Sequence, residues 1–448
     1  MVLQRGAAVA IWGLADAGEN ITVSFAGQQK KTIADKDGKW MVKLDAMKAS
    51  DKPQSMSIEG TNTIVLQNIL VGEVWLCSGQ SNMEYTMMKE SKFAHALRST
   101  GLDSSALKNE RNTSIRLFLV KRDLTKPDGG GVNKGWNEAE GESLRAFSAA
   151  GYFFAKNLFE ELHVPIGMIA SSVSGSAIEP WMPGEVKKDS GTQNLSIDES
   201  QPGKFYTGMI KPLAPFTLKG FLWYQGETNC FLKETTAYTF KFTHLVNSWR
   251  RLWNEPDASF YFVQIAPFQY SKGGQKILLT ETDLPAFRQA QAAALSLPHT
   301  GMVITTDLVD NTTDIHPTYK WEIGRRLALL ALAHDYGKNV SYSGPVFKKA
   351  ERKNDAVEIS FDHAEHGLMS IDNQALNSFE IAGTDGHFVP ADASTEGSKL
   401  LVRSPAVASP AFVRFAWNET AQPNFFNKDG LPAAPFESSV SKALTAKK

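Results

Sequence analysis

A serine that follows an apolar run is the first residue with chemical potential. Ser81 comes shortly after the run Ile69–Cys77, and Gly79 permits a tight turn between them. A serine hydroxyl becomes an effective nucleophile when a base removes its proton and a tight turn holds its oxygen exposed. The alternative is an ordinary strand-to-loop turn in which Ser78 and Ser81 cap backbone amides. The pattern makes Ser81 a candidate nucleophile.

A histidine in a later loop is the candidate base. His316 lies in the stretch Thr312–Pro317, after the apolar run Met302–Thr306. An imidazole can accept a hydroxyl proton near neutral pH, and Asp314 is close enough in sequence to orient the ring. The alternative is a capped helix N-terminus with His316 exposed and idle. The spacing of the nine histidines does not suggest a zinc site, so we expect no metal.

Two further loops offer donors for a developing negative charge. Gln225 and Asn229 follow the apolar run Phe221–Tyr224, and their side-chain amides can donate hydrogen bonds to an acyl oxygen. Gly175, after the run Val164–Ala170, can present a bare backbone N–H to the same oxygen. The alternatives are a polar supporting turn and an ordinary small-residue strand exit.

The elements that must position these loops alternate between short apolar runs and longer amphipathic segments from residue 69 to 337. The predicted strands are Ile69–Cys77, Ile115–Val120, Val164–Ala170, Phe221–Tyr224, Phe260–Ile265 and Met302–Thr306. The predicted helices are 148–162, about 234–253, about 285–296 and 317–335. This alternation predicts an α/β domain with a parallel sheet covered by helices, whose chemistry lies at the carboxyl ends of the strands.

Both ends of the chain have the patterning of β structure. In residues 1–68, alternating runs at Ile21–Phe25 and Trp40–Leu44 flank Asp37-Gly38 and predict a hairpin. Residues 338–448 contain four further strand-like runs. We expect both regions to be antiparallel β and to pack on the domain formed by residues 69–337.

The composition excludes several classes of protein. The chain has 448 residues, with 42% hydrophobic and 21% charged, which is enough apolar material for a real core. The formal net charge is −1, whereas nucleic-acid binding usually needs a basic excess, so we expect no nucleic-acid partner. No apolar run approaches the roughly 20 residues that span a bilayer. We expect Cys77 and Cys230 to be buried free thiols, with one bridge between them as the alternative.

The order of these loops resembles the SGNH hydrolase superfamily, whose catalytic serine comes first and whose histidine comes last. Three local motifs are similar to the sialate O-acetylesterase family: Gly72–Met83, Trp223–Asn229 and Ile315–Pro317. The resemblance covers essentially the whole chain, because members of this family attach β-sandwich regions around the esterase domain. It implies an SGNH-like α/β fold with antiparallel β-sandwich regions at both termini.

The resemblance also implies roles for the candidate residues. Ser81 would be the nucleophile and His316 the general base, with Gly175, Gln225 and the Ser81 N–H forming an oxyanion hole. Thr313 stands where the superfamily often has its aspartate, three residues before the histidine. The acid is therefore open between Asp314, the strand-end residues Asp307 and Asp310, and a Ser–His pair without an acid.

The implied activity is hydrolysis of O-acetyl groups on sugars without a metal or organic cofactor. The family points to 9-O-acetylated sialic acid, and similar bacterial enzymes act on xylan, xyloglucan or pectic sugars. The rivals are an inactive carbohydrate-binding protein and a lipase or thioesterase. The resemblance implies a periplasmic or secreted protein, although the amino-terminal sequence lacks the pattern of a secretory signal.

Overall fold

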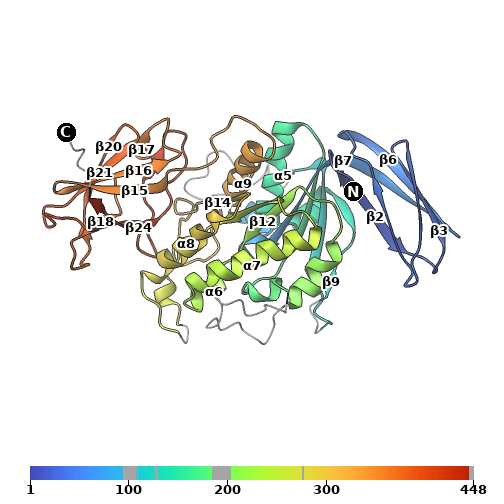
Figure 1. Ribbon diagram of the computed structural model, residues 1–448, viewed down its shortest axis with the longest axis horizontal. Coiled ribbons are helices and arrows are strands. Elements are labelled where there is room, and N and C mark those ends of the chain that lie inside the picture. Colours follow the sequence, from blue (N-terminus) through green and yellow to red (C-terminus); the bar gives the residue numbers. More distant parts are fainter. Residues whose placement is uncertain (94–106, 108, 127–129, 184–202, 275–276, 443–448) are drawn as a thin grey trace. The chain divides into compact units, whose positions relative to one another are not determined.

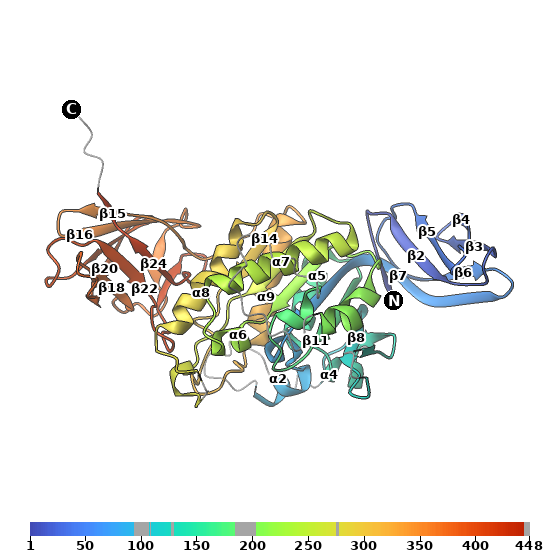
Figure 2. The same ribbon diagram turned by 60° about the horizontal axis from the view of Figure 1, so that its bottom comes forward.

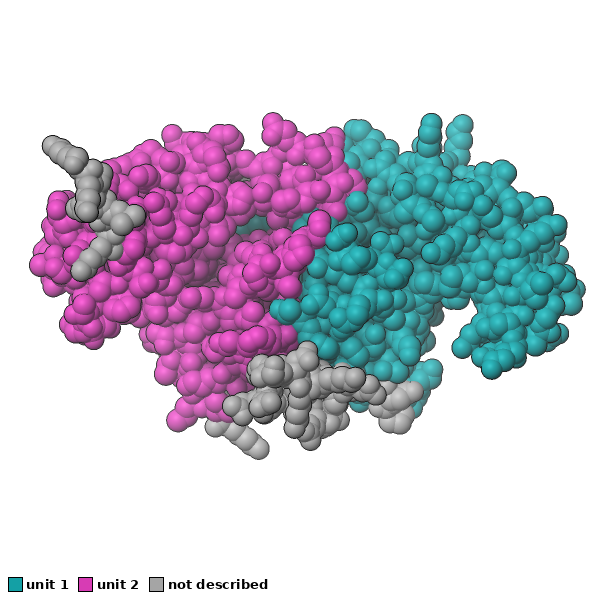
Figure 3. Space-filling view, viewed as in Figure 1, with its two compact units in different colours: residues 1–224, 243–261, 320–328 teal, residues 225–242, 262–319, 329–448 magenta. Residues whose placement is uncertain are grey.

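The computed structural model describes residues 1–93, 107, 109–126, 130–183, 203–274 and 277–442. The chain comprises two compact units, coloured in Figure 3. Unit 1 comprises Met1–Tyr224, Thr243–Tyr261 and Lys320–Ala328, and unit 2 comprises the remaining segments Gln225–Phe242, Phe262–Tyr319 and Leu329–Lys448. Residues 443–448 of the predicted C-terminal β region lie outside the described residues.

The central sheet is mixed, with parallel strands at its centre, as the continuous apolar runs predict, and antiparallel strands beside one of them (Figure 1). The strands are β7 (Thr63–Gly79), β8 (Asn112–Arg122), β9 (Gly131–Val132), β10 (Trp136–Ala139), β11 (Ile166–Ser172), β12 (Gly220–Tyr224), β13 (Ser259–Val263) and β14 (Thr300–Val303). Their order is β10-β8-β11-β7-β12-β13-β14. Strand β11 is parallel to both β7 and β8, and β12 is parallel to β7, whereas β10 is an antiparallel neighbour of β8.

Helices cover both faces of the sheet in unit 1. The helices within the described residues are α1 (Ser81–Glu84), α2 (Met87–Phe93), α4 (Gly141–Arg145), α5 (Ala149–Leu162), α6 (Glu227–Phe231), α7 (Thr236–Trp253), α8 (Asp283–Ala293) and α9 (Lys320–His334). Short 3-10 turns occur at Glu179–Trp181, Lys211–Leu213, Tyr270–Lys272 and Ala294–Ser296, and a π turn at Tyr206–Ile210. On one face Phe154 of α5 lies 5.0 Å from Trp75 of β7, and on the other Trp249 of α7 lies 5.5 Å from Phe221 of β12 (ring centroids). The four predicted helices are thus confirmed within a few residues.

The N-terminal region forms two β layers around a small apolar core (Figure 2). Its strands are β1 (Val2–Gln4), β2 (Val9–Leu14), β3 (Asn20–Phe25), β4 (Gln28–Ile33), β5 (Lys39–Leu44) and β6 (Ser50–Glu59). One layer is the β2–β5 pair, and the other joins β3, β4 and β6 to the first half of β7. Pairing is antiparallel except for β1, which runs parallel to β7.

The predicted hairpin across Asp37-Gly38 is wrong in its partner strands. The turn exists, because the Gly38 N–H donates to the Asp35 carbonyl and Gly38 has φ +75°. It connects β4 to β5, however, and β5 pairs with β2 while β3 pairs with β4. The sequence Gln28–Ile33 is polar on both faces and carries too little hydrophobic alternation to be recognised as a strand.

The C-terminal region packs two antiparallel sheets around an apolar core. Its strands are β15 (Val346–Lys353), β16 (Ala356–Asp362), β17 (Leu368–Ser370), β18 (Phe379–Ala382), β19 (Val389–Pro390), β20 (Asp392–Glu396), β21 (Lys399–Arg403), β22 (Phe412–Phe415), β23 (Phe425–Asn427), β24 (Phe436–Ser439) and β25 (Ser441–Lys442). The sheets have the orders β20-β21-β16-β15-β25 and β19-β18-β22-β24, with β17–β23 as a separate pair. Only the short β25 runs parallel to its described neighbour, β15. Val357, Val413 and Phe425 are fully buried between these strands.

The predicted division between residues 68 and 69 falls inside β7, which continues without a break from the N-terminal layer into the central sheet. The division into three domains, 1–68, 69–337 and 338–448, stays a prediction. In the part of the chain that the structure describes, no helix combines the length and apolarity needed to cross a membrane.

Candidate active site

The turn after β7 presents Ser81 at the start of α1. Gln80 and Asn82 are buried on either side of Ser81, which is half-buried. The Gln80 carbonyl accepts the N–H groups of Met83 and Glu84, each at 2.9 Å. The first N–H groups of a helix, here including that of Ser81, have no acceptor within the helix. Ser81 therefore begins α1 with a backbone N–H that has no acceptor within the helix, and its role as nucleophile stays a prediction.

Gly79 is required by a close backbone approach. It has φ +143°, and a Cβ at this position would lie 2.1 Å from the Tyr224 carbonyl oxygen at the end of β12. The same carbonyl accepts the Gln80 N–H at 3.0 Å. The end of β7 is thus held against the end of β12, and only glycine fits there.

The Gly175 loop is held beside the Ser81 turn within unit 1. The Val173 N–H donates to the Gly79 carbonyl at 3.1 Å. Glu84 of α1 accepts hydrogen bonds from both the N–H of Ser174, at 2.7 Å, and its hydroxyl. Gly175 is exposed with φ +72°, and a Cβ there would meet nothing within 4 Å. These two strand-end loops are therefore in contact, and the donation of the Gly175 N–H to an oxyanion stays a prediction.

Gln225 and Asn229 form one buried network in unit 2. The Gln225 side-chain amide donates to Asn229 Oδ1 at 2.7 Å, and Gln225 Oε1 accepts the Tyr238 hydroxyl at 2.9 Å. Asn229 Nδ2 in turn donates to Glu234 at 3.2 Å. One N–H of each amide is therefore committed to holding the other residues of the network. Their donation to an oxyanion stays a prediction.

The His316 loop is built by tight side-chain turns. Asp314 Oδ1 accepts the His316 backbone N–H at 2.9 Å and lies 3.5 Å from Nδ1 of the ring. Asp310 accepts the Tyr319 hydroxyl at 2.7 Å, and Asp307 is buried. The side chain of Asp314 is 58% exposed and that of His316 36%. Asp314 is thus within an ion-pair distance of the imidazole, and the choice among the three candidate acids stays a prediction.

The predicted site residues are divided between the two units. Ser81 and Gly175 belong to unit 1, and Gln225, Asn229, Asp314 and His316 belong to unit 2. The partnership of Ser81 with His316 stays a prediction.

Both cysteines are free and buried, as expected. Burial raises the pKa of Cys77 to about 12 and also raises that of Cys230. Neither thiol is suited to act as a thiolate nucleophile. Across the described residues, no group of three or more His, Cys, Asp or Glu side chains is arranged to hold a metal ion.

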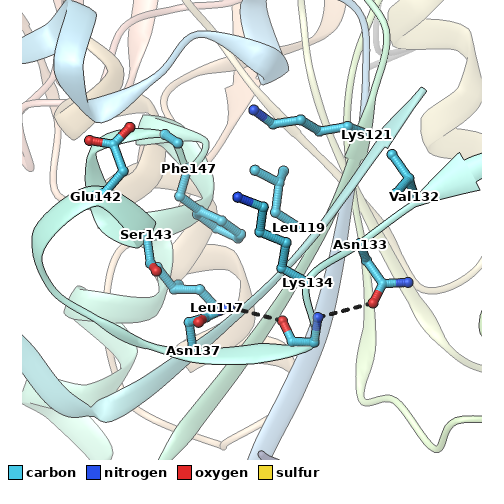
Figure 4. A pocket seen from close by; sticks show the side chains of 12 residues that line it. Leu117, Leu119, Lys121, Val132, Asn133, Lys134, Asn137, Glu142, Ser143 and Phe147 are labelled. Carbon is cyan, nitrogen blue, oxygen red and sulfur yellow. Dashed lines mark hydrogen bonds between the residues drawn. The ribbon is translucent and has the colours of Figure 1, made fainter. Parts of the chain in front are cut away.

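Unit 1 also contains a cavity of about 230 Å³ beside β8, β10 and α4 (Figure 4). Leu117, Leu119 and Phe147 give it an apolar lining, while Lys121 and Lys134 carry charge at its walls. The Gly135 N–H donates to Asn133 at 3.0 Å, and the Asn137 amide donates to the Gly135 carbonyl at 3.0 Å. No predicted catalytic residue lines this cavity, so we do not assign it to the reaction.

Three supporting residues were not identified from the sequence. Glu84 anchors the Gly175 loop, Lys320 donates to Asn82 Oδ1 at 2.8 Å, and Glu90 accepts the Lys320 N–H at 3.0 Å. Glu84 lies three residues after Ser81 on the same helix, α1, and Lys320 lies four residues after His316 and begins α9. This short spacing could have identified Glu84 and Lys320 from the sequence. The contact between Glu90 and Lys320 could be identified only from the structure, because the two residues are far apart in the chain.

Known proteins of one family are similar to this chain over most of its length. The family described as "Carbohydrate esterase, sialic acid-specific acetylesterase" matches residues 71–333. The sialate O-acetylesterase of Rattus norvegicus is 29% identical, covering 98% of this chain and 93% of the relative, and that of Pongo abelii is 30% identical, covering 97% and 90%. A carbohydrate acetylesterase structure from Xanthomonas citri is 36% identical, covers 98% of this chain and 96% of its own, and superposes with a TM-score of 0.84. The chain therefore belongs to the carbohydrate esterase family of sialic acid-specific acetylesterases.

Proposed function

We propose that this protein is a serine-dependent carbohydrate O-acetylesterase whose substrate is an O-acetylated sialic acid. Membership of the family makes it a carboxylic ester hydrolase. The observation that most strongly supports a serine mechanism is the turn at Ser81, where a half-buried hydroxyl lies between buried neighbours beside the Gly175 loop.

The proposed reaction proceeds in two acyl-transfer steps. His316 removes the Ser81 hydroxyl proton as the oxygen attacks the acetyl carbonyl carbon. The N–H groups of Ser81 and Gly175, with Gln225, stabilise the oxyanion. The C–O bond to the sugar then breaks, and the sugar oxygen receives the proton from His316. Water repeats the attack on the acetyl-enzyme, releasing acetate and restoring Ser81.

Asp314 is the acid that we assign to this mechanism. Its carboxylate oxygen lies 3.5 Å from His316 Nδ1, so a small rotation of either side chain would bring it within hydrogen-bond reach. Its negative charge would stabilise the imidazolium formed during attack, and Nε2 would remain for Ser81.

The test measures ester hydrolysis of four substrates by the wild-type protein and by Ser81→Ala, as acetate release from the three acetylated substrates and octanoate release from the octanoyl ester. We expect 9-O-acetylated sialic acid to be deacetylated faster than acetylated xylo-oligosaccharide, and an acetyl ester faster than its octanoyl analogue. Preference for the xylo-oligosaccharide would redirect the proposal to plant polysaccharides. Preference for the octanoyl ester would indicate a lipase or thioesterase, and sugar binding without acetate release would indicate a binding protein.

We also propose, from the family resemblance alone, that the protein acts in the periplasm or outside the cell. Fractionation of the source cells, followed by detection of the chain and its acetylesterase activity, tests this location. Recovery only in the cytoplasmic fraction would contradict it.

A further inference from the structure

A buried lysine begins the helix that follows the His316 loop. Lys320 is the first residue of α9 and has no exposed surface. Its ammonium lies 4.6 Å from the Tyr85 ring centroid and 5.5 Å from that of Tyr224, and it donates to Asn82 Oδ1 at 2.8 Å. Aromatic faces and an amide oxygen replace water around the charge. The acceptor, Asn82, directly follows Ser81.

The lysine is itself fixed in place from α2. Glu90 is buried, and its Oε1 accepts the backbone N–H groups of Lys320 at 3.0 Å and of Trp321 at 3.3 Å. One carboxyl oxygen therefore accepts two N–H groups of the first turn of α9, which have no acceptor within the helix. The backbone and the side chain of Lys320 are thus connected to two different helices, α2 and α1.

A buried charge is costly to maintain, and apolar residues of similar size often replace buried ion pairs without loss of stability. The amide of Asn82 is also fully buried, so its orientation depends on its hydrogen-bond partners. A hydrogen bond from a charged donor is stronger than one between neutral groups, and it fixes direction as well as distance. The side chain next to Ser81 is held by a bond of this kind.

We propose that Lys320 is a positioning residue that fixes Asn82 and, through it, the turn presenting Ser81. This inference rests on the proposed function. Lys320 does not touch the substrate in this scheme. It restricts the orientation of the Ser81 hydroxyl and N–H, and small misplacements of reacting groups reduce the rate of the chemical step.

The test uses Lys320→Met, Asn82→Leu and the double variant, with turnover of an acetyl ester measured per mole of folded protein. We expect each single variant to lower kcat roughly 10- to 100-fold, with KM within about threefold, because ground-state binding is unchanged. The kcat of the double variant should be no more than about threefold below that of the less active single variant, because the two substitutions remove the same hydrogen bond. Wild-type kcat in folded Lys320→Met, or multiplied losses in the double variant, would overturn the proposal.

A second comparison remains informative if Lys320→Met does not fold. Asn82→Asp keeps an oxygen acceptor for the ammonium, so its kcat should exceed that of the similarly sized Asn82→Leu by at least about tenfold. Equal kcat values for these two variants would overturn the proposal. Lys156→Met is the control. Lys156 lies on α5, and its ammonium donates to a Glu110 carboxylate oxygen at 2.8 Å. This variant should retain kcat within about twofold of the wild type.

Failure of the proposed function gives a different result. A wild-type protein with no acetyl ester turnover, and no covalent labelling of Ser81 by a small organophosphonate, would remove the basis for both proposals. An active wild-type protein whose labelling rate is unchanged by Lys320→Met would overturn the positioning role alone.

Discussion

Ser81 shows how much of the chemistry is visible at the level of single residues. The sequence indicated the turn before Ser81, because the apolar run predicts a buried strand and Gly79 permits a tight turn after it. The acid could not be chosen in the same way, since Asp307, Asp310 and Asp314 all lie near His316 in sequence. Their side-chain partners differ, as the hydrogen bond from the Tyr319 hydroxyl to Asp310 shows, and the identity of the acid stays a prediction. The sequence does not encode such partners locally.

Ser81 and His316 should behave as one catalytic group. Ser81→Ala and His316→Ala should each lower turnover by several orders of magnitude, leaving the contribution of the oxyanion hole and binding. The double variant should be little worse than either single one, because both side chains act on the same proton. Steady-state acetate release with folding checked by circular dichroism measures this. Losses that multiply, or Ser81→Ala turnover above about a tenth of wild type, would rule out the shared role.

Asp314→Asn tests the acid. The substitution preserves shape and removes the charge that stabilises the imidazolium, so kcat should fall by roughly 10²–10⁴ if Asp314 orients His316. Asp310→Asn is the matched control, because Asp310 is bonded to Tyr319, and it should have a much smaller effect. A loss below about fivefold for Asp314→Asn, with His316→Ala inactive, would favour a Ser–His pair or another acid.

At the scale of elements, hydrophobic periodicity was a reliable guide where both faces of a strand are buried. It located β8, β11 and β12 and the four long helices within a few residues. It failed for β4, whose residues are exposed or half-buried throughout, and strand pairing in the N-terminal layers was therefore misjudged. The link from Glu90 to the start of α9 spans 230 positions and depends on tertiary packing alone.

Gly79→Ala should disrupt the junction between β7 and β12. The added Cβ would lie 2.1 Å from the Tyr224 carbonyl oxygen at φ +143°, so both strain and a clash oppose folding. We expect a loss of about 2–4 kcal/mol in the free energy of unfolding, measured by urea denaturation. Gly18→Ala is the control, since Gly18 has φ +82° with open space around its Cβ position, and it should cost about 1–2 kcal/mol. Equal losses in the two variants would contradict the close approach.

Glu90 should make stability depend on pH. Burial raises the pKa of this carboxyl to about 7 from an ordinary 4.5, against the lowering effects of Lys320 and two backbone N–H groups. The folded state then binds more protons than the unfolded state between these values. The contribution of Glu90 is therefore greatest below about pH 4.5 and is lost as the pH rises through about 7.

The comparison of wild type with Glu90→Gln isolates this effect. The difference in free energy of unfolding should change by about 1–3 kcal/mol between pH 5 and pH 8, with the wild type losing stability relative to the variant. Urea denaturation at four pH values measures the difference. A difference that is constant with pH, or that changes in the opposite direction, would show that Glu90 does not titrate in this range.

At the scale of the whole molecule, β7 joins the N-terminal layers to the catalytic sheet. Ile69 and Val71 on this strand are buried in the N-terminal core with Met56. Deletion of residues 1–49 would expose these side chains at a cost of about 1.5–3 kcal/mol each, a large part of a typical total stability of about 5–15 kcal/mol. We expect the truncated chain to be insoluble or to melt more than about 10 °C lower. Recovery of a soluble protein with the wild-type melting temperature would show that the N-terminal layers are dispensable.

The continuity of β7 also limits where this chain can change length. Side chains alternate between the two faces of a strand, so one residue inserted after Val71 would turn Cys77 away from α5 and rotate Ser81 to the wrong side. Even a two-residue insertion would carry Gly72 and Gly79 out of register with the carbonyls of Pro165 and Tyr224, against which they fit. Insertions and deletions should therefore be tolerated in loops of the N-terminal layers. Between Val71 and Ser81 they should not be tolerated, because the number of residues in this segment sets the position of Ser81.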